Sequence, residues 1–136
     1  MQLYSIASGS SGNCIYLGEE DGGILIDAGI SRKRIVTGLE RKGLSLDDIK
    51  AIFVTHEHSD HISGLGPVLR KNPIPVYATA DTVSAIWEKT NMNNISPELF
   101  HSIRPEEEIE AGEMLVRPFS ISHDAVAVSY THLTLP

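Results

Sequence analysis

A short apolar run that ends abruptly in a cluster of histidines constrains this chain more than any other feature. The run, Ala51–Val54, is rich in β-branched and aromatic residues and is typical of a buried strand. The next seven residues, Thr-His-Glu-His-Ser-Asp-His, contain three imidazoles and two carboxylates. Imidazole nitrogen and carboxylate oxygen are ligands of zinc and similar divalent ions, and a strand end can aim several of them at one point. The pattern therefore predicts a metal site where this strand ends.

The spacing within the cluster is compatible with two adjacent ions. Alternate residues of an extended segment point the same way, so His56 and His58 can share one ion, while a following turn directs Asp60 and His61 to another. Paired ions activate water and stabilise the attacking and leaving oxygens, which favours hydrolysis. A structural zinc site is one alternative, although such sites usually use four ligands, commonly cysteines. A solvated polar loop with incidental histidines is the other.

The rest of the chain mixes short strands with helices. One helix is predicted after Ser31, a suitable cap, with Ile35 and Leu39 on its apolar side and Gly43 past its end. A second helix is predicted to begin near Thr79. Strands are predicted over Leu3–Ser8, Cys14–Leu17, Gly23–Asp27, Ala51–Val54, Val76–Ala78, Phe100–Ile103 and Met114–Ser120. This is an α/β pattern in which both hairpins and crossovers are possible.

Composition narrows the classes of partner. The formal net charge of −7 argues against a broad surface for polyanions, although it does not exclude a phosphate bound through metal. No apolar stretch approaches the roughly 18 residues needed to cross a bilayer, and the first residues do not resemble a signal peptide. The single cysteine, Cys14, cannot form an internal disulfide, which agrees with a reducing compartment. We therefore expect a cytoplasmic location and no membrane partner.

The histidine cluster, followed by Gly64, resembles the signature of the metallo-β-lactamase-fold hydrolases. The resemblance runs from residue 1 to about residue 128 and implies an α/β fold, the N-terminal half of an αββα sandwich. It implies that His56 and His58 bind the first ion, that Asp60 and His61 bind the second, and that Asp60 also orients the water.

Two further residues enter through this resemblance. Asp27, at a predicted strand end, matches the family's first carboxylate, which mainly supports the ligands from behind. His123, in the sequence Ser-His-Asp-Ala after a strand, matches the third histidine of the first ion. Asp124 is expected to be a solvated carboxylate or a partner of His123, and His101 a surface histidine.

Within the superfamily, the Ser-Gly-Ser-Ser-Gly-Asn segment near the start is similar to the YycJ family of bacterial, cytoplasmic, metal-dependent DNA exonucleases. A substrate loop is therefore possible at Ser10, Ser11, Gly12 and Asn13, because small residues beside a metal can admit a phosphate oxygen. A simple hairpin loop is the alternative.

The end of the sequence departs from the family pattern. The family's later bridging aspartate and final histidine should lie beyond His123. We therefore expect residues 1–128 to be a metallo-β-lactamase-like domain that stops before its second half. Residues 129–136, which no longer resemble the family, are expected to be a non-native tail, so that His132 is not a predicted ligand.

The expected function is metal-dependent hydrolysis of phosphodiester bonds in DNA, in the manner of a 5′-to-3′ exonuclease, by a metal-activated water. The expected cofactors are two divalent ions, zinc in the first instance and manganese as the alternative. One rival is a small-molecule hydrolase of the same fold acting on a thioester, lactone, cyclic phosphate or β-lactam. The other is a metal-binding fragment without turnover.

Overall fold

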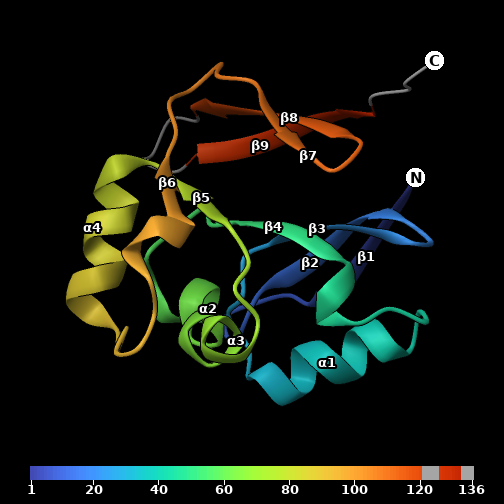
Figure 1. Ribbon diagram of the computed structural model, residues 1–136, viewed down its shortest axis with the longest axis horizontal. Helices are drawn as coiled ribbons and strands as arrows, with labels where there is room; N and C mark the ends of the chain where they lie inside the picture. The colour runs from blue at the N-terminus through green and yellow to red at the C-terminus, as the bar shows by residue number, and fades with distance from the viewer. Residues whose placement is uncertain (121–125, 133–136) are drawn as a thin grey trace.

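The computed structural model has three layers, with helices on one side of a central sheet and a smaller sheet on the other (Figure 1). It describes residues 1–120 and 126–132. The central sheet contains six strands in the order of the sequence, and the smaller sheet contains three. The predicted α/β class is confirmed.

The central sheet changes direction partway across. Its first three strands are antiparallel neighbours, and each later strand pairs in parallel with the one before it. The strands are β1 (Gln2–Ala7), β2 (Cys14–Glu19), β3 (Gly22–Ile26), β4 (Ile49–Phe53), β5 (Val76–Ala78) and β6 (Phe100–Ser102). Because β3, β4, β5 and β6 are parallel, their carboxyl ends meet at one edge of the sheet.

The second sheet is antiparallel throughout. It consists of β7 (Ile109–Ala111), β8 (Met114–Ser120) and β9 (Val126–His132). Strand β9 includes residues 129–132 of the predicted non-native tail, and Ser129 pairs with Arg117. The origin of the tail and the domain boundary at residue 128 stay predictions.

The helices connect the parallel strands and cover one face of the central sheet. They are α1 (Arg32–Glu40), α2 (Ser59–Ile62), α3 (Leu65–Lys71) and α4 (Ala80–Lys89), with 3-10 turns at Leu46–Asp48 and Pro97–Leu99. As predicted, Ser31 caps α1, its Oγ accepting from the Arg34 N–H at 3.2 Å. The chain then turns at Gly43, and the Leu44 N–H donates to the Leu39 carbonyl at 2.9 Å.

Two apolar cores form because successive residues of a strand face opposite sides of the sheet. Leu25 and Ile52 belong to the core under the helices, whereas Ile24 and Phe53 belong to the core shared with the second sheet. All four side chains are buried. Strand β4 is therefore covered on both faces, so its carboxyl end is a rigid platform for the residues that follow.

Trp87 is partly buried against the core under the helices and packs edge-on against Phe100, with ring centroids 5.3 Å apart. Helix α3 and strand β7 were not predicted. Within residues 1–120 and 126–132, no helix has the length and apolar character to cross a membrane.

Candidate metal centre

The site begins where β3 and β4 end side by side. Ile26 and Phe53 are register partners in these parallel strands, and the Asp27 N–H donates to the Phe53 carbonyl at 2.7 Å. The residue that follows β3 is therefore held beside those that follow β4. This places Asp27 next to Thr55 although 28 residues separate them in sequence.

Asp27 is a buried carboxylate with all its contacts directed at the histidine cluster. The residue is 5% exposed and its backbone has φ of 65°, a conformation that aspartate tolerates better than most residues. Oδ1 accepts from the Thr55 N–H at 2.8 Å, and Oδ2 accepts from the Thr55 hydroxyl at 2.7 Å and lies 2.7 Å from Nδ1 of His61. Asp27 thus holds Thr55 and His61 in place, and its predicted support of metal ligands stays a prediction.

The contact with Asp27 decides which nitrogen of His61 can bind metal. A carboxylate oxygen accepts, so Nδ1 carries the proton and Nε2 is left to accept or to ligate. Nε2 lies 3.6 Å from Oδ2 of Asp60. The hydrogen bond to Asp27 raises the pKa of His61, with burial opposing it and the negative charges of Asp27 and Asp60 adding to it.

Thr55 determines in the same way which nitrogen of His56 carries the proton. Its hydroxyl donates its single hydrogen to Asp27, so the Nδ1 of His56, 3.0 Å from that oxygen, acts as the donor. The Nε2 atoms of both His56 and His61 are thereby the nitrogens available to an ion. Sequence reasoning named Thr55 only as the start of the motif, because its shared role depends on the pairing of β3 with β4.

The three imidazoles of the motif lie close together. The ring centroids of His56 and His61 are 4.7 Å apart, and those of His56 and His58 are 5.9 Å apart. The predicted turn after His58 is the short helix α2, which takes Asp60 and His61 off the extended path. His123 and Asp124 lie outside the described residues. His101 is exposed and stacks on Tyr77 with centroids 5.0 Å apart, as expected of a surface histidine.

The loop between β1 and β2 is tied directly to Asp60. The Asn13 N–H donates to the Asp60 carbonyl at 2.7 Å, and the Asn13 amide donates to that carbonyl at 3.1 Å and to Oδ2 at 3.3 Å. The same amide donates to the Gly9 carbonyl at 2.9 Å. Asn13 therefore holds Asp60 in place, a role that sequence reasoning missed, while Ser10 and Ser11 are exposed and stay candidates for substrate contact.

Backbone contacts lock the segment after Asp27 onto the motif. The Ala28 N–H donates to the His61 carbonyl at 2.8 Å, and the Gly29 N–H donates to the Asn13 carbonyl at 2.8 Å. A Cβ at Gly29 would lie 1.8 Å from the Asp60 carbonyl oxygen, so only glycine fits there. Three segments distant in sequence thus meet with their backbones in contact.

The imidazole nitrogens and the carboxylate oxygens of the motif suit a divalent ion as ligands. The hydrogen bonds that hold these side chains are of the kind that orient metal ligands. The histidine-rich motif predicts divalent ions at this edge of the sheet. Among residues 1–120 and 126–132, however, no three His, Cys, Asp or Glu side chains already surround a common point. The hydrogen bonds behind the ligands are in place, and His56, His58, Asp60 and His61 would turn their free donor atoms toward the ions.

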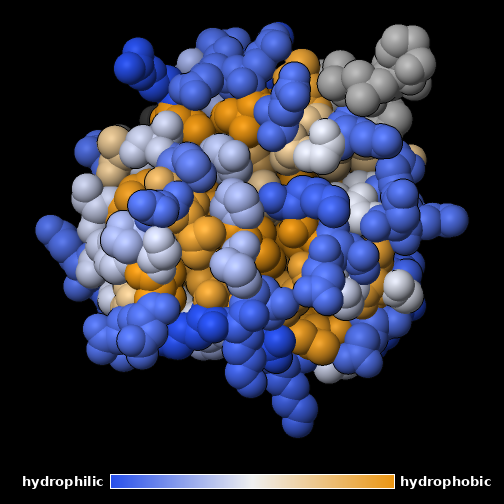
Figure 2. Space-filling view, viewed as in Figure 1, coloured by the Kyte–Doolittle hydropathy of each residue, from blue (hydrophilic) through white to orange (hydrophobic). Residues whose placement is uncertain are grey.

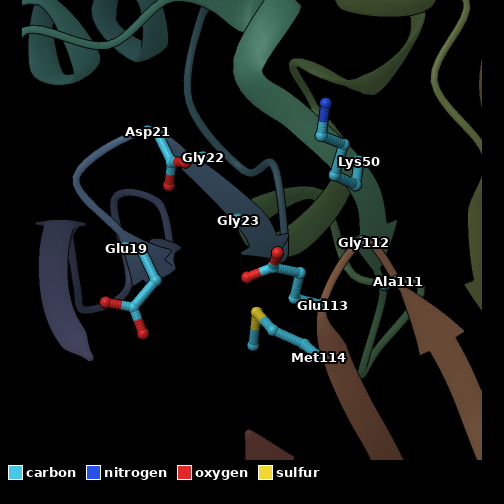
Figure 3. Close-up of a pocket in the computed structure, with 9 residues that line it drawn as sticks. All are labelled: Glu19, Asp21, Gly22, Gly23, Lys50, Ala111, Gly112, Glu113 and Met114. Atoms are coloured by element: carbon cyan, nitrogen blue, oxygen red, sulfur yellow. The ribbon is translucent and has the colours of Figure 1, made fainter. Parts of the chain in front are cut away.

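A separate hollow of about 200 Å³ lies at the opposite edge of the central sheet, at the amino ends of β3 and β4 (Figure 3). Three carboxylates, those of Glu19, Asp21 and Glu113, are spread around it, together with Lys50. The side chains of Asp21, Glu113 and Lys50 form no ion pair or hydrogen bond within the described part of the chain. The hollow is therefore remote from the histidine cluster and lacks its network.

The sequence profile of the metallo-beta-lactamase superfamily matches residues 7–127. With a helix–sheet–sheet fold and a His-x-His-x-Asp-His motif at the carboxyl edge of its central sheet, the chain belongs to this superfamily.

Two similar proteins are exodeoxyribonucleases by name. The chain is 38% identical over 120 residues to exodeoxyribonuclease YycJ of Bacillus anthracis, which covers 88% of this chain and 45% of that protein. It is 38% identical over 128 residues to exodeoxyribonuclease WalJ of Streptococcus pneumoniae, which covers 93% of this chain and 48% of the relative. The chain thus spans about half the length of the curated relatives it matches. The predicted resemblance to the YycJ family is confirmed.

A solved structure, that of the Rm3 metallo-β-lactamase, superposes with a TM-score of 0.76 at 17% identity. The match covers 94% of this chain and 53% of that chain. At this identity the match shows the fold alone.

Proposed function

We propose that this chain carries the metal-binding motif of a phosphodiester hydrolase that acts on DNA as an exonuclease. The observation that carries the proposal is the shared hydrogen-bond system of Asp27 and Thr55, which leaves Nε2 of His56 and of His61 as donor atoms beside Asp60. The names of the relatives, both exodeoxyribonucleases, support DNA as the substrate.

In this proposal each residue has a defined task. His56, His58 and His123 hold one ion, and Asp60 and His61 hold the second; zinc is the first candidate and manganese the alternative. When bound, divalent ions make water acidic at neutral pH and stabilise charge on phosphoryl oxygens. Asp60 orients the attacking water and accepts its hydrogen bond, Asp27 fixes the ring of His61, and Asn13 fixes Asp60.

The first experiment measures the metal content of the purified 136-residue chain together with nucleotide release from 5′-phosphorylated DNA. Close to two ions per chain, with release that stops when a chelator is added, would support the proposal and contradict the truncated domain predicted from the sequence. His58→Ala and Asp60→Ala should remove turnover while the circular dichroism spectrum is kept. His101→Ala is the matched control, because His101 is exposed, lies on β6 outside the motif and is not a predicted ligand, and it should behave as the parent protein. Turnover retained by either site variant would contradict the assignment, and metal binding without turnover in the parent would contradict the activity.

A further inference from the structure

A groove lined by basic side chains runs between α1 and the edge strand β1. It encloses about 410 Å³ and is lined by Ile6, Lys33, Arg34, Thr37, Gly38 and Arg41, which we call the basic groove. Hydrophilic side chains project from the lower edge of the molecule, where α1 lies (Figures 1 and 2). The groove is separate from both the histidine cluster and the acidic hollow.

The groove owes its shape to a close approach of helix and strand. A Cβ at Gly38 would lie 2.5 Å from Cγ2 of Ile6, so α1 rests against β1 at this glycine. Arg34, Gly38 and Arg41 are four and three residues apart, which places them on one side of the helix. The two arginines are therefore about 10 Å apart along the helix axis.

The charge of the groove is unusual for this chain. Three of its six lining residues are basic and none is acidic, in a chain with a formal charge of −7. Within the described residues, the side chains of Lys33, Arg34 and Arg41 form no hydrogen bond or ion pair. Glu40, the acidic residue of α1, does not line the groove. Lys42 continues the basic row beyond Arg41, with its Nζ 4.8 Å from the ring centroid of Tyr4.

The start of α1 and the end of β1, which flank the groove, both lie near the metal motif. Helix α1 begins at Arg32, just after Gly29, which lies against the Asp60 backbone. Strand β1 ends at Ala7 and leads into the loop in which Gly9 and Asn13 are hydrogen-bonded and Asn13 contacts Asp60. A linear polyanion in the groove would therefore lead to the proposed site of cleavage.

We infer that the basic groove holds the phosphodiester backbone of single-stranded DNA, beyond the nucleotide that is cleaved. The inference rests on the proposed function and adds a binding path to it. A row of unpaired cations along one helix suits a chain of regularly spaced phosphates, and the lining carries no aromatic side chain on which bases could stack. Binding should therefore depend strongly on salt and little on base sequence.

The test measures binding of a fluorescent single-stranded oligonucleotide to the full chain in EDTA, so that cleavage does not interfere. Arg34→Gln with Arg41→Gln should weaken binding about tenfold and lower the slope of log affinity against log salt by about 1.4, since each lost phosphate contact contributes about 0.7 on single strands. Lys71→Gln with Lys89→Gln removes the same charge from exposed positions at the ends of α3 and α4, and should change affinity less than about twofold.

Two outcomes would overturn the inference that the basic groove binds DNA. One is an equal loss in the groove and control variants. The other is displacement of the oligonucleotide by polyglutamate or by phosphatidylserine vesicles at equal charge concentration, which would show a general anion surface. Hydrolysis of bis(p-nitrophenyl) phosphate by the parent protein, with metal added, separates this test from the proposed function. Groove-dependent binding without that hydrolysis would contradict the function and support the groove, and hydrolysis with groove-independent binding would do the reverse.

Discussion

The two edges of the central sheet differ in how their polar groups are held. At the carboxyl edge, Asp27 and Thr55 connect two imidazoles through short hydrogen bonds, and Asn13 binds Asp60 through both backbone and side chain. At the amino edge, carboxylates surround a hollow, yet within the described residues the side chains of Asp21, Lys50 and Glu113 form no hydrogen bond or ion pair. The candidate metal site is therefore distinguished by its network of hydrogen bonds and not by the volume of a hollow.

The largest expected loss of stability comes from substitution of Asp27. Asp27→Ala leaves three partly buried donors without an acceptor, and the free energy of unfolding should fall by about 3 kcal/mol. Urea unfolding at neutral pH measures this loss. Asp27→Asn separates the backbone from the charge, because asparagine tolerates a positive φ and still accepts from Thr55, and its cost should be about half as large. A loss below about 1 kcal/mol for the alanine variant would mean that the network contributes little.

Glycine substitutions compare the two edges directly. Gly29→Ala forces a Cβ against the Asp60 carbonyl oxygen, a backbone atom that cannot move aside, and should cost about 3 kcal/mol. At the other edge, a Cβ at Gly112 would meet Cγ of the flexible Lys50 side chain at 3.1 Å, and the backbone there has φ of 62°. Gly112→Ala should therefore cost about 1 kcal/mol in the same unfolding assay. Equal losses of unfolding free energy at the two positions would contradict the difference between the two edges of the sheet.

A smaller effect on stability is expected at Asn13. Asn13→Ala removes the amide contacts with Asp60 and Gly9 and should lower the free energy of unfolding by about 1 kcal/mol. Under the proposed function it should also weaken metal affinity about tenfold, measured by competition with a chromophoric chelator. Glu113→Gln, at the rim of the acidic hollow, should change stability by less than about 0.5 kcal/mol and leave metal affinity unchanged. A matching loss of metal affinity in the Glu113 variant would contradict the assignment of metal binding to the carboxyl edge alone.

A last comparison concerns alkaline pH and two buried groups of β2. Burial, and then the charge of Asp27, raises the pKa of Cys14 from 9.0 to about 12; burial, and then the charges of Asp21, Asp48 and Glu19, raises the pKa of Tyr16 from 10.0 to about 12. Both groups ionise more readily in the unfolded chain, so their contribution to stability is present below pH 9.0 and is lost as the pH rises toward about 12.

Urea unfolding at pH 8 and at about pH 11 should therefore show a lower stability at the higher pH. Cys14→Ala should reduce the difference between the two values. The native Cys14 thiol should also resist iodoacetamide at pH 8, because the buried group is neutral there and only the thiolate reacts. Rapid alkylation of the native protein would contradict this.

Local patterns in the sequence predicted most elements but few of the contacts between them. The strands before Asp27 and Thr55 were predicted from apolar runs, and the cap at Ser31 from residue type. Helix α3 was missed because Gly66 and Pro67 are poor helix residues, although Pro67 lies in the first turn, where its lack of an N–H costs little. Strand β7 was missed because it is short and carries Glu110 within an acidic run.

For the site, the sequence and its family resemblance supplied the residues but not their connections. The histidine motif and Asp27 were named in advance. The roles of Thr55 and Asn13 were not, because each depends on which distant segment lies beside it. Thr55 reaches Asp27 only through parallel pairing of β3 and β4, and Asn13 reaches Asp60 across 47 positions of sequence.

The meeting of the Asn13, Gly29 and Asp60 backbones has a consequence for how the molecule folds. Each contact closes a long stretch of chain, so its entropic cost is recovered only after the strands on both sides have paired. The histidine motif should therefore be assembled late, after β2, β3 and β4 are in register. In the native protein, the amide hydrogens of Asn13, Ala28 and Gly29, all donors to distant carbonyls, should exchange with solvent together, in a single opening event.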